Sequence, residues 1–264
     1  MDGWSKMSER VRAVLRMPSA SLSQCELTHI DRIPIDIERA LGQHRAYADL
    51  LARLGAEVTI LDPLPAYPDS CFVEDAALAF RECFVLTSPG VESRRAEPAM
   101  LRGALPGDRP VLAIDHPATI DGGDVLRVGT AVFVGLTSRT NTAGIAALRT
   151  AVAPFGYTVT AVPDDAALHL KTAVTAASDA CVLINPAWVD RTLFAAFNQI
   201  EVDPAEPFAG NCLAIGGSLV MQQAHPRTAG RLAARGFAVA SVDVSEFAKA
   251  EAGLTCLSLL IPPA

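Results

Sequence analysis

The stretch DVLRVGTAVFVGLTSRTNTAGIAALRTAVAPFGYTVTAVP, residues 124–163, predicts one complete structural unit of the fold. Its first two apolar segments, DVLRV and AVFVGL, flank Gly129 and predict two strands joined by a tight turn. A helix is expected next, because Asn141 suits its N-cap and Gly156 follows its end. YTVTAVP then predicts a third strand. The unit is therefore strand, strand, helix, strand.

The same rhythm recurs on both sides of this stretch. Before it, AALAF and CFVLTS predict a hairpin, SRRAEPAMLRGAL a helix and VLAID a strand. After it, LKTAVTAA and CVLIN start a third unit, and CLAIG, SLVMQQ, RTAGRLAARG and FAVASVDV supply a fourth. Because no linker or low-complexity segment interrupts the rhythm, we expect a single α/β domain over residues 1–264.

A fifth unit is split between the two ends of the chain. LSLLI, near the C-terminus, is expected to pair with RAVLRM, near the N-terminus. DIERALGQHRAYADLLARLG is the helix of this unit, with Gly55 as its stop, and EVTILD is its last strand. Pairing of the two ends closes the five units into a ring and leaves no free sheet edge there.

Composition excludes several classes of function. The net charge of −7 and the lack of a basic stripe argue against nucleic-acid binding. No apolar segment is long enough to span a bilayer, and the opening residues do not resemble a secretion signal, so we expect a cytoplasmic protein. The six cysteines are far apart and form no CxxC pair, which argues against structural zinc and a disulfide framework.

Polar residues stand just before the first strand of every unit. Asp75 follows Glu74 in the first unit, and from Asp75 onward the position recurs every 42 to 48 residues. Each residue alone has an ordinary interpretation: an aspartate beside two glycines suits a turn, a lone histidine before a strand suits a satisfied hydrogen-bonding residue, and a lone cysteine suits packing. Units that circle one axis bring the five positions together, which favours a pocket. The positions are Asp75, Asp121, His169, Asn211 and Cys256.

This set of side chains predicts attack on a cationic substrate. A cysteine thiolate is a strong nucleophile near neutral pH, and a histidine can protonate a leaving group and then activate water. Two carboxylates can grip a planar guanidinium through paired hydrogen bonds. Asn211 is expected to hold a backbone group near the axis.

Seven segments together resemble the dimethylarginine dimethylaminohydrolases, a family of the guanidine-modifying superfamily that includes arginine deiminases and amidinotransferases. They are DSCFVEDAAL, SRRAE, TIDGGDVL, GLTSRTNTAG, LHLKT, NCL and LTCLSLLI. The resemblance implies a five-bladed α/β propeller of ββαβ modules around a pseudo-fivefold axis. It also implies hydrolysis of Nω-methylated L-arginine, asymmetric dimethylarginine or monomethylarginine, to L-citrulline and dimethylamine or methylamine. The implied route is a covalent S-alkylthiouronium intermediate, with no cofactor.

The resemblance assigns roles residue by residue. It implies that Cys256 is the nucleophile and His169 the general acid and base. Asp75 and Asp121 match the carboxylates that hold the guanidinium, with Glu74 beside them as a substrate contact or an orienting residue. The remaining matches concern the amino-acid end of the substrate: Arg94 and Arg139 for its carboxylate, Asp69 and Ala250 for further contacts, and Leu22 in a mobile flap.

Alternatives remain open at this point. A related hydrolase could act on unmethylated arginine or citrulline, and a catalytically silent member could only bind arginine analogues. Zinc could inhibit through Cys256 and His169, since thiolate and imidazole are good zinc ligands. A homodimer is also left open. The other histidines match no motif and are expected at the surface or in loops: His29, His44, His116 and His225.

Overall fold

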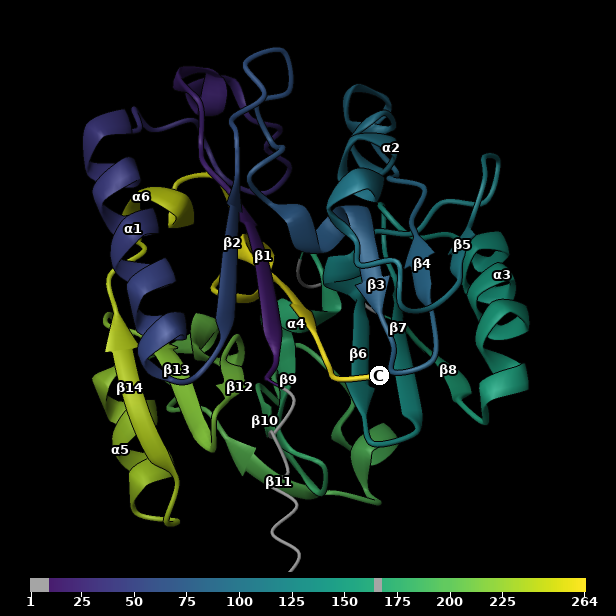
Figure 1. Ribbon diagram of the computed structural model, residues 1–264. Helices are drawn as coiled ribbons and strands as arrows, with labels where there is room; N and C mark the ends of the chain where they lie inside the picture. The colour runs from purple at the N-terminus through teal and green to yellow at the C-terminus, as the bar shows by residue number, and fades with distance from the viewer. Residues whose placement is uncertain (1–9, 164–167) are drawn as a thin grey trace, which may run out of the picture.

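The computed structural model describes residues 10–163 and 168–264. Short sheets surround a common centre, and the three longest helices lie on the outside of the molecule (Figure 1). These helices are α1 (Ile37–Arg53), α3 (Thr142–Val152) and α5 (Pro226–Ala233). Residues 1–9, on which the expectation about a secretion signal partly rests, lie outside the described residues.

Five three-stranded sheets share one topology. In each, the first strand pairs antiparallel with the second strand, and the second pairs parallel with the third. The strands are β3 (Ala77–Ala79), β4 (Phe84–Leu86) and β5 (Val111–Ala113); β6 (Val125–Val128), β7 (Ala131–Leu136) and β8 (Thr158–Pro163); β9 (Val174–Ser178), β10 (Cys181–Ile184) and β11 (Asn198–Glu201); β12 (Leu213–Ile215), β13 (Ser218–Gln222) and β14 (Ala238–Val242); and β15 (Leu259–Ile261), β1 (Arg12–Arg16) and β2 (Glu57–Leu61). This arrangement confirms the five-module α/β propeller predicted from the sequence.

The two ends of the chain meet in the fifth sheet. β1 pairs antiparallel with β15, with Arg12 opposite Ile261 and Val14 opposite Leu259, and it pairs parallel with β2. In Figure 1 the purple β1 runs beside the yellow C-terminal segment. The predicted pairing of LSLLI with RAVLRM is therefore present.

The helix α1 follows its sequence signals closely. Asp36 caps it by accepting a hydrogen bond from the Arg39 amide at 3.0 Å, and Gly55, with a φ of 97°, supplies the left-handed residue at its end. One expectation was wrong: His44 lies on the buried face of α1 and is only 1% exposed, because it packs against Phe247. His225 is also buried, just before α5.

The remaining helical segments are short. The predicted helix over 93–105 is divided into a 3-10 turn at Glu92–Arg94, the helix α2 (Glu97–Leu101) and a 3-10 turn at Arg102–Ala104. The helix α6 (Ser245–Ala248) precedes the last strand. Other 3-10 turns lie at Ala20–Gln24, Ala153–Phe155 and Arg191–Phe194.

A short helical turn precedes the first strand of each sheet, and these turns position the polar residues. The turn at Val73–Ala76 contacts those at Gly122–Asp124 and Thr255–Leu257, while α4 (Leu170–Ala173) contacts the turns at Gly122–Asp124 and Pro207–Gly210. The five sequence positions predicted to meet lie in or directly beside these turns. The turns thus bring the polar residues together at one end of the propeller axis.

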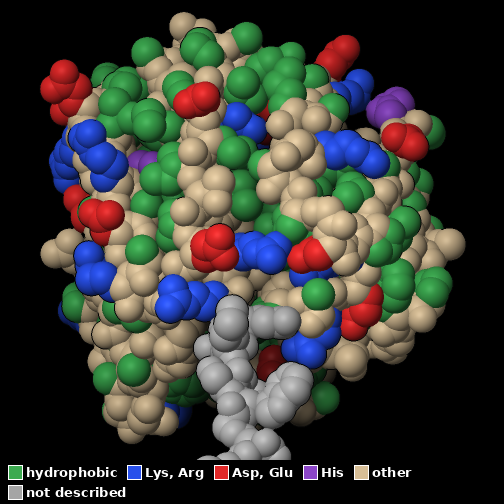
Figure 2. Space-filling view, in the orientation of Figure 1, with side chains coloured by type: hydrophobic (Ala, Val, Ile, Leu, Met, Phe, Trp, Pro, Cys, Tyr) green, Lys and Arg blue, Asp and Glu red, His purple; other side chains and the backbone are tan. Residues whose placement is uncertain are grey.

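Charged side chains of both signs are interspersed on the face shown in Figure 2. In the described part of the chain, no helix combines the length and hydropathy needed to cross a membrane.

Tyr47 connects α1 to the segment that carries Cys256. Its buried hydroxyl donates to the Leu254 carbonyl at 3.0 Å and lies 2.8 Å from Ser258 Oγ. We expect Tyr47→Phe to lower the free energy of unfolding by about 1–3 kcal/mol, because it leaves buried polar partners unsatisfied. Urea denaturation measures this loss, and Tyr67→Phe is the control. Equal stability of the Tyr47 variant and the parent would show that the connection contributes nothing.

Candidate active site

Most of the predicted site residues line one small cavity of about 20 Å³. Space of this size admits about one water molecule. Seven of the ten predicted residues line it: Asp69, Asp75, Arg94, Arg139, His169, Ala250 and Cys256. The structure therefore brings together residues from four modules that lie far apart in the sequence.

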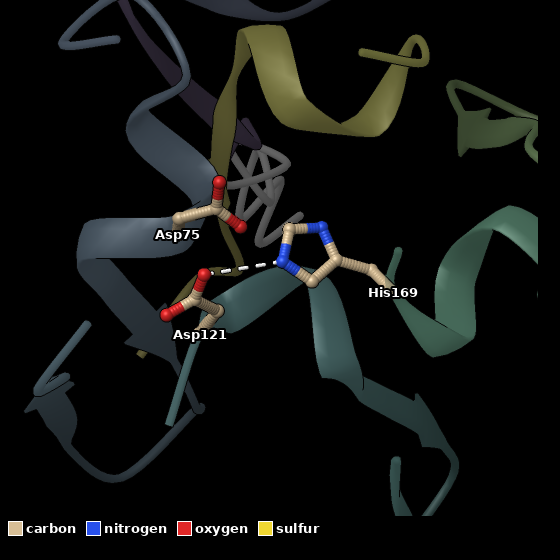
Figure 3. A group of neighbouring side chains, drawn as sticks. All are labelled: Asp75, Asp121 and His169. Carbon is tan, nitrogen blue, oxygen red and sulfur yellow. Dashed lines mark hydrogen bonds and ion pairs between the residues drawn. The ribbon is translucent and has the colours of Figure 1, made fainter. Parts of the chain in front are cut away.

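Asp75 and Asp121 face the imidazole of His169 from one side (Figure 3). His169 Nε2 lies 3.1 Å from Asp121 Oδ2, and Asp121 Oδ1 accepts a hydrogen bond from the Gly90 amide at 2.9 Å. Asp75 accepts from the Gly123 amide at 2.9 Å and from Arg94 Nη1 at 2.7 Å. Asp121 is completely buried and does not line the cavity. Its side chain contacts His169 and the Gly90 amide instead.

The two glycines of DGGD allow this close approach. A Cβ on Gly122 would lie 1.9 Å from the Glu74 carbonyl oxygen, and a Cβ on Gly123 would lie 2.5 Å from His169 Nδ1. No side chain fits at either position. The glycine pair therefore does more than form a turn, because it lets the segment pack directly against His169 and Asp75.

The carboxylates stabilise a protonated imidazole. Burial alone lowers the pKa of His169, but the nearby charge of Asp75 and the hydrogen bond to Asp121 outweigh it and raise the pKa to about 9. For Asp75, burial raises the pKa, but the charges of His169 and Arg94 outweigh this effect and lower it to about 2. At neutral pH the site thus holds an imidazolium beside an ionised carboxylate.

Cys256 lies in the 3-10 turn before β15 and is 8% exposed. Burial, together with the charges of Asp75 and Glu74, raises the pKa of its thiol to about 12. Asn211 fixes the turn, since its side chain donates to Thr255 Oγ1 at 3.1 Å and accepts from the Thr255 amide at 3.2 Å. Asn211 therefore has the structural position expected from the sequence. The Cys256 thiol is neutral in the unliganded protein.

Arg94 has different partners from those expected. Its guanidinium is 4% exposed and donates to Asp75 at 2.7 Å and to Glu97 at 2.8 Å, three residues further along the chain. The positive charge of Arg94, which was expected to bind the α-carboxylate of a substrate, is thus already paired with the side chains of Asp75 and Glu97. Arg139 differs, because its Nη2 donates only to the hydroxyl of Thr28, at 2.8 Å, among the described residues.

Besides Asp121, two predicted residues do not line the small cavity. Glu74 forms an ion pair with Lys171, and both face a separate cavity of about 650 Å³ that runs along the first strands of the sheets. This location favours the orienting role for Glu74 over direct substrate contact. Leu22 is fully buried in the hydrophobic core, within the long connection between β1 and α1.

Asp124 was not singled out from the sequence, although it is the second acid of DGGD. It is completely buried and accepts hydrogen bonds from Thr140 Oγ1 at 2.6 Å and from the Leu170 amide at 3.0 Å. Thr140 Oγ1 in turn accepts from the Asp121 amide at 3.1 Å. Asp124 therefore ties the backbone of Asp121 to the backbone next to His169.

Asp75, Asp121 and His169 also form a group with the composition of a metal site. One potential ligand atom from each lies within 4.8 Å of the others, and Cys256 is not part of the group. Two neighbouring carboxylates also suit a guanidinium group, since carboxylates bind this planar cation through paired hydrogen bonds.

Known proteins resemble this chain over nearly its whole length. No family model matches the chain. The dimethylarginine dimethylaminohydrolase of Streptomyces coelicolor is 41% identical over 250 residues, which cover 94% of this chain and 96% of that protein. The corresponding protein of Pseudomonas aeruginosa is 34% identical over 85% of this chain and 89% of its own length. The solved structure of a cysteine-to-serine mutant of the Pseudomonas protein, complexed with citrulline, superposes with a TM-score of 0.90 at 32% identity, covering 96% of this chain and 100% of that one.

The charge balance around His169 predicts its titration. We expect NMR of the imidazole ring to give a pKa of about 9 for His169. Asp121→Asn should lower this pKa, because it removes an anion that stabilises the imidazolium. His44, whose pKa burial lowers to about 4, does not contact Asp121 and serves as the internal control. A His169 pKa that is unchanged in Asp121→Asn would contradict the assigned pairing.

Proposed function

This chain belongs to the dimethylarginine dimethylaminohydrolase family, and from that premise we propose that it hydrolyses free Nω-methylated L-arginine. The substrates are asymmetric dimethylarginine and monomethylarginine, and the products are L-citrulline with dimethylamine or methylamine. The citrulline complex of the related Pseudomonas protein supports the assignment of the product.

The observation that carries this proposal is the surplus of buried negative charge beside a neutral thiol. Asp75 and Asp121 are buried together, and His169 is their shared cationic neighbour. The same negative charge helps to keep the thiol of Cys256 protonated. A cationic substrate both satisfies the carboxylates and lowers the pKa of the thiol, because a nearby positive charge favours the thiolate.

The proposed reaction has two halves. With the guanidinium bound, the Cys256 thiol loses its proton to solvent. The sulfur then attacks the guanidinium carbon and forms a C–S bond, while His169 protonates the departing alkylamine as the C–N bond breaks. An S-alkylthiouronium remains on Cys256. His169, now neutral, takes a proton from water, the water oxygen bonds to the same carbon, and the C–S bond breaks. Citrulline leaves, and the thiol regains its proton.

The amino-acid end of the substrate has fewer candidates than the guanidinium end. Arg139 is the better candidate for gripping the α-carboxylate, since Arg94 is committed to Asp75 and Glu97. Asp69 is buried at the cavity wall and is a candidate for the α-amino group, with Ala250 beside it. These contacts require a ligand of about the length of arginine.

The proposal extends to the setting of the enzyme. We propose one catalytic domain over residues 1–264 that acts in the cytoplasm on a small-molecule substrate and requires no cofactor. All six cysteines are free, and a reducing compartment keeps the Cys256 thiol available. Inhibition by zinc through Cys256 and His169 stays a prediction.

A substrate panel tests the function. We expect citrulline from asymmetric dimethylarginine and monomethylarginine, and little or no turnover of agmatine, which lacks the α-carboxylate. Citrulline is measured by a colorimetric assay, the alkylamine by liquid chromatography, and ammonia by its release from unmethylated substrates. Unmethylated arginine or citrulline turning over as well as the methylated substrates would favour the related-hydrolase alternative, and no turnover of any compound would favour a silent binding protein.

Two variants in the same panel separate chemistry from binding. Cys256→Ser should retain the fold and lose turnover, since a hydroxyl ionises far less readily than a thiol. Arg139→Lys should raise KM for methylarginine more than it lowers kcat, because the carboxylate contact persists from ground state to transition state.

A further inference from the structure

A long connection of twenty residues, 17–36, joins β1 to α1, and one of its residues, Glu26, lines the active-site cavity. Connections of this length without much structure of their own are often lids. We call residues 26–30 the strap. Its first residue, Glu26, lines the cavity together with Glu251, which lies five residues before Cys256.

Glu251 binds three consecutive backbone amides of the strap. Its carboxylate accepts hydrogen bonds from Thr28 N at 2.7 Å, His29 N at 2.5 Å and Ile30 N at 3.0 Å. Bonds from amides to an ionised carboxylate are stronger than bonds between neutral groups. One side chain thus fixes a segment more than 200 residues away in the sequence.

The backbone of Glu251 is held in a strained conformation. Its φ is 57°, and among the described residues it is the only non-glycine with a positive φ. Helices commonly end with a glycine in this conformation, because a Cβ disfavours it. A glycine after α6 would relieve the strain but would offer no carboxylate to the strap. The conformation directs the Glu251 side chain to the three amides.

The strap also occupies groups that the proposed function assigns to the substrate. Asp69 accepts the Glu26 amide at 3.2 Å, and Arg139 donates to Thr28 Oγ1 at 2.8 Å. With the strap in this position, the cavity of about 20 Å³ is far too small for an amino acid of the length of arginine. The strap must therefore move before a substrate can bind.

We propose that the Glu251 carboxylate is the latch that holds residues 26–30 closed over the active site. Glu251 is a positioning residue: it contacts the strap and not the reacting atoms. The latch stabilises the closed position of the strap in the unliganded protein. It stabilises the same position again when the strap closes over a bound amino acid. Its effect on kinetics rests on the proposed function, whereas its effect on the strap does not.

Hydrogen–deuterium exchange of the unliganded protein tests the latch without any need for activity. In Glu251→Gln, the side-chain NH2 group opposes backbone N–H donors, so we expect the amides of residues 28–30 to exchange about 10-fold faster or more. Glu251→Asp keeps the charge on a shorter side chain and should restore part of the protection. Glu38→Gln, an exposed change in the first turn of α1, is the control and should leave exchange unchanged.

Glu251→Gly keeps the test independent of misfolding. It should release the strap as Glu251→Gln does, while the relieved backbone strain offsets part of the stability lost with the three hydrogen bonds, so that the protein stays folded. Unchanged exchange of residues 28–30 in both variants would overturn the latch. So would loss of protection throughout the protein in both, because Glu251 would then serve the fold as a whole.

Steady-state kinetics give the functional readout. With the latch removed in Glu251→Gln, we expect KM for methylarginine to rise about 10-fold, because the closed state that grips the amino-acid end is less populated. kcat should stay the same or rise, since Glu251 does not touch the reacting groups. A fall in kcat at unchanged KM would contradict the latch. If even the parent turns over no guanidine, the proposed function fails, while the exchange experiment still decides the latch.

Discussion

The arrangement of the site depends on burying three carboxylates at one end of the propeller axis. Asp75, Asp121 and Asp124 are each less than 3% exposed, and most of their hydrogen bonds come from backbone amides and threonine hydroxyls. Such donors satisfy the oxygens without cancelling their charge. Arg94 and His169 are the cationic side chains that contact them. Because buried charge is costly, the surrounding turns must be placed closely, and the glycines of DGGD make this possible.

The same charge explains why the Cys256 thiol is protonated in the unliganded protein and why His169 is already the imidazolium that can protonate a leaving amine. Nearby carboxylates favour imidazolium at His169 and disfavour thiolate at Cys256. A ligand without positive charge does not lower the pKa of the Cys256 thiol. A bound guanidinium lowers this pKa, so in the proposed mechanism the substrate itself generates the nucleophile. In the proposed mechanism, the site therefore selects cations before any contact with the alkyl groups is considered.

The fold could be predicted from the sequence because turn residues and apolar segments repeat in every module, and the polar residues precede the same strand each time. Once the five modules are placed in a ring, these polar residues must face one another at its centre. The ion pairs of Arg94 could not be predicted in this way. Its pairing with Asp75 depends on how neighbouring segments pack in three dimensions, and only the spacing of three residues to Glu97 is visible in the sequence. The roles of Asp124 and Glu251 depend on hydrogen bonds to backbone amides, which leave no signature in side-chain type.

Mass spectrometry of the protein quenched with acid during turnover of monomethylarginine tests whether Cys256 is the nucleophile. We expect a mass increase that matches a thiouronium adduct, found on the proteolytic peptide that contains Cys256 and absent from the peptides of the other five cysteines. The adduct should be absent when substrate is omitted. Citrulline formation by a protein whose Cys256 carries no adduct at any quench time, together with undiminished turnover by Cys256→Ser, would contradict it.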